Sequence, residues 1–236
     1  MKTGLFSHID ASIAHQEKEA VVRIIREGRV AQKTLELAIK TLAWTDYIIA
    51  GTEAEPPLSR PIVCQTGCHF CCFNQVEVTP PEALVSGDFV ERTFTADEKT
   101  ALLAELDRAV QFKSDKTKVE IAHLRQELRC PLLRCGRCAV YEVRPLVCRA
   151  IHSLNADHCE LALRLGKNTG VEHYSHRDEI VGSLLHGLME GCREMGCQAD
   201  PLDLARALLD FFAGPSPLER WIEGEQIFTP LHYAES

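Results

Sequence analysis

The sequence has few aromatic residues and no long hydrophobic run, and each shortage narrows the classes of protein to consider. Aromatic side chains make up 6% of its 236 residues, while leucine and alanine are frequent, which favours helices. No window approaches the roughly 18 consecutive apolar residues that a membrane helix needs. The N-terminal stretch is mixed polar rather than apolar. We therefore expect no signal peptide, no membrane partner and a cytoplasmic location.

An excess of basic residues is also missing. The formal net charge is −8, from 26 Lys and Arg against 34 Asp and Glu. Nucleic-acid binding depends on neutralising phosphates with basic side chains, so we expect no nucleic-acid partner. The net charge does not exclude a protein partner, and no feature of the sequence indicates which protein that would be. The 45% hydrophobic content is ordinary for a globular protein, so the core does not need a metal to compensate for missing apolar residues.

The common catalytic motifs are absent as well. The chain contains no G-x-S-x-G, no P-loop, no G-x-G-x-x-G and no H-E-x-x-H. The sequence therefore contains no hydrolase or kinase motif. The sequence indicates no catalytic residue, and whether the protein is an enzyme stays open at this point.

Apolar residues recur at helical spacing along most of the chain, which predicts a mainly α protein. Capping boxes open two of the expected helices, one at Thr79 with Glu82 and one at Thr95 with Glu98. A helix starting at Cys148 would also align His152 and Cys159 with it. The other helices are expected over 10–27, 30–50, 118–128, 180–195 and 200–212, with a linker over 51–61.

Three consecutive segments are expected from this pattern. Residues 1–60 form an N-terminal helical hairpin, with Leu35, Ile39, Leu42 and Ile49 on one buried face of its second helix. Residues 61–165 form a cysteine-cluster metal-binding domain. Residues 166–236 form a C-terminal helical extension packed around it.

Cysteine is the residue present in excess. Four of the eleven cysteines fall in nine residues, at Cys64, Cys68, Cys71 and Cys72. Folded as a helix, this stretch places the four sulfurs on one side; folded as a turn around Gly67, it makes Cys68 and Cys71 a chelating pair. Adjacent cysteines rarely form a disulfide with each other, and cytoplasmic thiols stay reduced. Both geometries therefore indicate a metal ion or a metal cluster.

A second group of cysteines lies about sixty residues further on. Its prolines and Gly136 break any long helix, so we expect a folded-back loop region. Neither group is a complete zinc ribbon, and we expect one site assembled from both. Two tetrahedral zinc ions, a thiolate-bridged cluster or one iron–sulfur cluster would suit it. The expected ligands are eight thiols: Cys64, Cys68, Cys71, Cys72, Cys130, Cys138, Cys148 and Cys159.

The remaining candidates have ordinary explanations. Cys192 and Cys197 are isolated in the sequence and are expected to pack as small hydrophobic residues. Cys135 is an extra thiol beside the site, and its place in the ligand set stays open. His69, His152 and His158 are expected to be ordinary polar residues, although each could serve as a ligand. Six arginines between Arg125 and Arg149 could offset the charge of thiolates, and Arg144 and Arg149 could hydrogen-bond the sulfurs.

The cysteine spacing resembles that of the YkgJ-type cysteine-cluster family, also described as zinc- or iron-chelating CxxCxxCC domain proteins. The first match is Cys64-x3-Cys68-x2-Cys71-Cys72 with the following Val76-Glu77-Val78-Thr79-Pro80-Pro81-Glu82-Ala83. The second runs from Cys130 to Ala150, and the segment from Ser153 to Glu160 also fits. The resemblance covers roughly residues 60 to 165. It implies metal chelation and the same eight cysteines, and it implies no particular reaction.

The hypothesis from the sequence is therefore a metal-binding protein that holds zinc or iron. Two alternatives stay open. One is an oxidoreductase whose iron–sulfur cluster carries electrons, and the other is a partner-binding module stabilised by zinc. Cys64, Cys68 and Cys71 also have the C-x3-C-x2-C spacing of radical S-adenosylmethionine enzymes, but no βα alternation of a barrel follows them.

Overall fold

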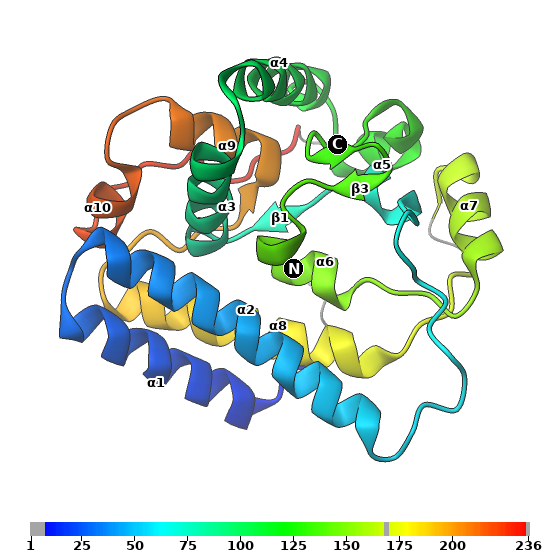
Figure 1. Ribbon diagram of the computed structural model, residues 1–236, viewed down its shortest axis with the longest axis horizontal. Coiled ribbons are helices and arrows are strands. Elements are labelled where there is room, and N and C mark those ends of the chain that lie inside the picture. The colour runs from blue at the N-terminus through cyan, green and yellow to red at the C-terminus, as the bar shows by residue number, and fades with distance from the viewer. Residues whose placement is uncertain (1–7, 168–169, 235–236) are drawn as a thin grey trace.

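The computed structural model describes residues 8–167 and 170–234 and is mainly α-helical, as the sequence predicts (Figure 1). No helix in this described part is long and apolar enough to cross a membrane. The α-helices are α1 (Ala11–Glu27), α2 (Ala31–Ala54), α3 (Pro80–Thr93), α4 (Ala96–Lys113), α5 (Lys118–His123), α6 (Leu146–Ala150), α7 (Ala156–Leu165), α8 (Ser175–Glu194), α9 (Leu204–Phe212) and α10 (Pro217–Ile222).

Short strands and 3₁₀ turns connect the helices. The first pair of strands joins β1 (Glu77–Val78) antiparallel to β4 (Leu202–Asp203). The second joins β2 (Leu133–Arg134) to β3 (Arg137–Cys138) in a tight hairpin. The 3₁₀ segments are η1 (Phe70–Phe73), η2 (Arg125–Glu127) and η3 (Tyr141–Val143).

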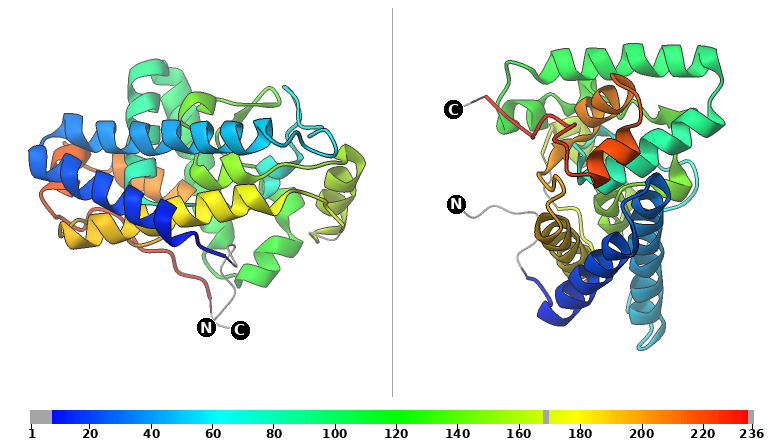
Figure 2. Two further views of the ribbon diagram at one scale, coloured as in Figure 1. Left: turned by 90° about the horizontal axis from the view of Figure 1, so that it is seen from below. Right: turned by 90° about the vertical axis from the view of Figure 1, so that its left-hand side faces the viewer.

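Three long helices, α1, α2 and α8, run side by side along one edge of the molecule (Figures 1 and 2). Helix α1 begins where predicted, because the Asp10 side chain accepts hydrogen bonds from the amides of Ser12 and Ile13. Its closest partner is α8, which comes far later in the chain. The predicted hairpin of α1 and α2 therefore packs against a helix of the C-terminal segment.

Helix α2 is one turn longer than expected and takes in Gly51, which we placed in a linker. Contacts with α8 hold this last turn. The Glu53 carboxylate accepts hydrogen bonds from Arg177 at 2.6 and 2.8 Å and also contacts the His176 ring at 2.9 Å. Tertiary ion pairing thus outweighs the roughly 1 kcal/mol that a glycine costs inside a helix.

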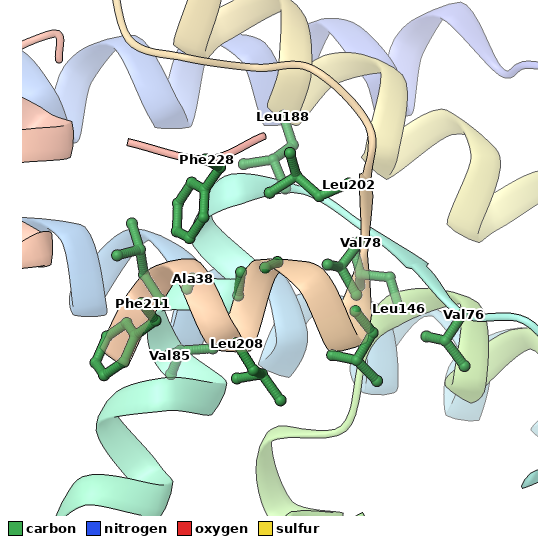
Figure 3. Packing of buried hydrophobic residues seen from close by; sticks show 14 of the residues in the cluster. Ala38, Val76, Val78, Val85, Leu146, Leu188, Leu202, Leu208, Phe211 and Phe228 are labelled. Carbon is green, nitrogen blue, oxygen red and sulfur yellow. The ribbon is translucent and has the colours of Figure 1, made fainter. Parts of the chain in front are cut away.

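The main core lies between this layer and helices α3, α4 and α9. Figure 3 shows Val85 of α3 beside Leu208 and Phe211 of α9, and Val78 of β1 near Leu146 of α6. Helix α9 packs against both α3 and α4. Because Val78 and Leu146 share this core, the segment after the first cysteine group packs against the part of the second group that carries Cys148.

Four details of the predicted helices are wrong. The helix expected from Cys148 ends at Ala150, and α7 begins only at Ala156, so His152 and Cys159 do not continue the Cys148 helix. The helix expected from 200 begins at Leu204 with Asp203 as its cap, because β4 pairs with β1 first. The predicted helix over 118–128 divides into α5 and η2. Ile39, expected inside, is 49% exposed.

Candidate metal centre

The first cysteine group folds as a turn rather than as a helix. Gly67 has a φ of 93°, a backbone conformation that glycine adopts readily, and the Cys68 amide closes the turn by donating to Gln65 O at 3.0 Å. The chain then enters η1, which carries Cys71 and Cys72. Of the two geometries that the sequence left open, the turn around Gly67 is the one observed.

The second cysteine group folds back on itself as the β2–β3 hairpin. Cys135 and Gly136 form its turn with φ values of 49° and 73°. The hairpin turn lies against the first group, because a Cβ added at Gly136 would be 3.7 Å from His69 Nδ1 and 3.8 Å from Gly67 O. The loop region predicted around the prolines is therefore confirmed, and Cys135 is exposed at its tip.

Backbone hydrogen bonds join the segments that bear cysteines. The Cys130 amide donates to Cys72 O at 2.7 Å, and the Val63 amide donates to Ser153 O at 3.0 Å. Helix α7, which carries Cys159, packs against η1 (Figure 1). The two groups, about sixty residues apart in the sequence, thus meet in space.

Cys71 interacts electrostatically with six of the other seven proposed ligands, and these six come from both cysteine groups. A charge on Cys71 raises the pKa of thiols on both sides of it. On one side are Cys64 and Cys68, which Cys159 also influences. On the other side are Cys130, Cys138 and Cys148. The Cys72 thiol completes the set through a hydrogen bond with Cys71.

Burial is the main cause of the raised pKa of most of these thiols. It raises the pKa of Cys130 to about 11 and that of Cys148 well above its ordinary value. The pKa of Cys71, which is exposed, is raised chiefly by its hydrogen bond with Cys72. A bound cation would reverse this preference for the protonated form, because metals bind the thiolate.

Backbone amides point at several of the sulfurs. The amides of Phe70, Leu132 and Val140 each donate to a cysteine two residues earlier in the chain, and the Ser153 amide donates to Cys64. Each of these bonds opposes the rise in pKa that burial causes. Hydrogen bonds of this kind stabilise thiolates and tune the metal that they hold.

Of the two arginines expected near the sulfurs, only Arg144 acts on them. Its charge lowers the pKa of Cys71 and Cys138, against the larger effects of burial and of the Cys71–Cys72 hydrogen bond. The Arg149 guanidinium instead binds two backbone carbonyls and Asp46 of α2. Arg149 is therefore an anchor for the chain that carries Cys148.

His69, His152 and the two isolated cysteines behave as ordinary residues, whereas His158 Nδ1 is buried without a hydrogen-bond partner among the described residues. His152 is buried, with Nδ1 2.8 Å from Ala150 O and Nε2 accepting from the Tyr174 amide at 2.9 Å, so both ring nitrogens are used. His69 Nδ1 lies 2.9 Å from Gly67 O. Cys192 and Cys197 are buried in the main core, away from the eight thiols.

The donor set fits a soft metal, although its side chains are not closed around one point. Over residues 8–167 and 170–234, no three His, Cys, Asp or Glu side chains converge closely enough to hold an ion. The thiols are nevertheless neighbours, and Cys64 and Cys71 are exposed. Thiolate sulfur is the ligand type that zinc, iron–sulfur clusters and copper(I) prefer.

Comparison with known proteins agrees with this chemistry. Residues 63–164 match the CxxCxxCC family, described as "Putative zinc- or iron-chelating domain". Neither the curated proteins nor the solved structures contain a match to this chain. The matched range contains all eight cysteines expected as ligands and excludes Cys192 and Cys197. Over residues 63–164 the chain therefore matches the model of the CxxCxxCC family, which confirms the resemblance in the cysteine spacing.

Proposed function

We propose that this protein binds zinc or iron through thiolates of the CxxCxxCC domain. The observation that carries the proposal is that the segments bearing the two cysteine groups lie side by side, since the Cys130 amide donates to Cys72 O and α7 packs against η1. The proposed ligands are those expected from the sequence, namely Cys64, Cys68, Cys71, Cys72, Cys130, Cys138, Cys148 and Cys159.

The residues around the thiols support binding in three ways. Backbone amides that donate to sulfur offset part of the negative charge of a thiolate. Arg144 adds a positive charge near Cys71 and Cys138. The exposure of Cys64 and Cys71 gives a metal a path from solvent into the site.

An iron–sulfur electron carrier is the second candidate function. The amides that donate to Cys68, Cys130 and Cys138 are of the kind that sets the reduction potential of such clusters. Exposed cysteines at one side of the site would place a cluster near the surface, where electrons can enter and leave.

The first experiment is elemental analysis with acid-labile sulfide and a visible spectrum, on protein purified without oxygen. We expect at least one zinc or iron per chain. Iron with matching sulfide and brown absorbance would favour the electron carrier, and zinc without colour or sulfide would favour a thiolate zinc site. Protein that takes up neither metal, even when each is supplied, would refute metal binding.

Single substitutions test whether the proposed thiols bind the metal. We expect Cys71→Ser and Cys72→Ser to lower the metal content at least twofold and the melting temperature with it, because metal binding adds to folding. Cys192→Ala, which removes a buried thiol outside the domain, is the matched control and should keep the metal content of the wild type. Equal metal content in all three variants would mean that the Cys71 and Cys72 thiols of η1 do not bind the metal.

A further inference from the structure

The Glu82 carboxylate connects the two cysteine groups although it lies in neither. Its Oε2 atom accepts hydrogen bonds from the amide and the hydroxyl of Thr79, at 2.8 and 2.7 Å, and completes the capping box of α3. Its Oε1 atom accepts from the Leu146 amide at 2.7 Å. Leu146 is the first residue of α6, so one carboxylate caps two helices.

This double role is specific to Glu82 among the three capping-box glutamates of the described helices. Glu120 makes the same bonds to Thr117, at 2.8 and 2.9 Å, at the start of α5. Glu120 is exposed, whereas Glu82 is 2% exposed. A carboxylate is costly to bury unless every bond it can make is satisfied, so the Leu146 bond is part of what holds it there.

Of the two helices that Glu82 caps, α3 follows the first group of proposed ligands and α6 carries one ligand of the second group. Helix α3 comes directly after η1 and β1, and α6 contains Cys148. Helix α6 has only five residues, too few to be stable by itself. The position of Cys148 therefore depends on what holds α6 from outside.

Arg149 holds the same short helix from its other side. It is 4% exposed, and it donates to Arg144 O at 3.0 Å and to Glu142 O at 2.9 Å. A third bond reaches Asp46 of α2. Glu82 and Arg149 thus fasten α6 to α3 and to α2.

We propose that Glu82, supported by Arg149, is a positioning residue of the metal centre. It sets the place of the Cys148 thiol relative to Cys71, Cys130 and Cys138. This inference rests on the proposed metal-binding function. It assigns no metal-ligand role to Glu82, whose two oxygens are both used by backbone and hydroxyl donors.

The test compares Glu82→Gln with Glu120→Gln in the metal-loaded full chain. Both variants replace a capping carboxylate with an amide, but only Glu82 accepts through both oxygens, so the NH2 of Glu82→Gln must face either the Leu146 N–H or the Thr79 donors. We expect metal release to a chelator to become at least tenfold faster in Glu82→Gln. The rise in melting temperature on adding metal should shrink by at least half. Glu120→Gln should match the wild type in both measurements.

The readouts separate positioning from a purely structural role. A structural role would lower the melting temperature of the metal-free and metal-loaded forms equally and leave metal release unchanged, and that result would overturn the inference. If Glu82→Gln does not fold, Arg149→Lys decides, because lysine keeps the charge but has one nitrogen in place of the three that bind Arg144 O, Asp46 and Glu142 O. Wild-type release from folded Arg149→Lys would then refute the inference. A wild-type protein that binds no metal would refute the proposed function instead.

Discussion

Glu17 is a carboxyl buried among apolar side chains between α1 and α2. It is 3% exposed, and its Oε1 atom accepts a hydrogen bond from the Thr41 hydroxyl. It lines a cavity of about 260 Å³ together with Leu37 and Trp44. Burial raises the pKa of Glu17 to about 7, and the Thr41 bond only partly offsets this rise.

The raised pKa predicts a loss of stability as the pH rises from about 4.5 to about 7. The folded state binds the Glu17 proton more tightly than the unfolded state, so the stabilising contribution is complete below the unfolded pKa of about 4.5 and is lost as pH rises through about 7. The wild type should lose about 3 kcal/mol relative to Glu17→Gln between pH 4.5 and 8. Urea unfolding at the two pH values measures this difference.

The control for this prediction is Glu19→Gln, which neutralises an exposed carboxylate on the same helix. It should keep the pH dependence of the wild type. If Glu17→Gln shows that same dependence, Glu17 does not bind its proton more tightly in the folded state.

At the level of elements, the contact of α1 with α8 depends on two glycines of α8. A Cβ at Gly187 would lie 2.2 Å from Ala14 O, and one at Gly191 would lie 2.7 Å from Val21 Cβ. The Ala14 backbone at Gly187 and the Val21 side chain at Gly191 therefore occupy the space that a side chain would need. The spacing Gly187-x3-Gly191 was visible in the sequence, but nothing local indicated that α1 would pack on it.

Gly187→Ala should destabilise the protein by about 2 kcal/mol, because the two helices must move apart to admit the methyl group. Gly51→Ala is the matched control, since its Cβ would meet nothing within 4 Å inside α2. It should leave stability unchanged or raise it by roughly 1 kcal/mol through helix propensity. Chemical denaturation of both variants gives the comparison, and equal stabilities would contradict close packing at Gly187.

Several elements were predictable because their signals are local. The Asp10 cap and the capping boxes at Thr79 and Thr95 are formed by residues within one helical turn of each other, and the structure has all three. The break between α6 and α7 was not predictable in this way. Bonds from Glu82 and Arg149 hold α6, and their partners are remote in the sequence or outside the helix.

At the level of the whole molecule, metal binding and folding should be linked, because the proposed ligands come from segments distant in the sequence. With free metal at one hundred times its dissociation constant, the loaded form should be more stable than the chelated form by about 3 kcal/mol. This difference should shrink from pH 8 to pH 6, because thiols such as Cys130 and Cys148 must lose protons to bind metal and burial raises their pKa.

Thermal unfolding with and without chelator at the two pH values measures this linkage. Cys71→Ser is the control, since loss of the central thiol should abolish most of the effect of metal. A metal-induced stabilisation that is the same at both pH values would mean that thiol deprotonation does not accompany binding.

The sequence by itself determined the helical class, most helix starts and the resemblance of residues 63–164 to the CxxCxxCC family, because these depend on short-range patterns of apolar, capping and cysteine residues. Only the tertiary structure decided that the segments bearing the two cysteine groups lie side by side and that Glu82 joins them. The physical reason is that these contacts join residues tens of positions apart. Their geometry depends on how the helices pack in the core, which no local pattern specifies.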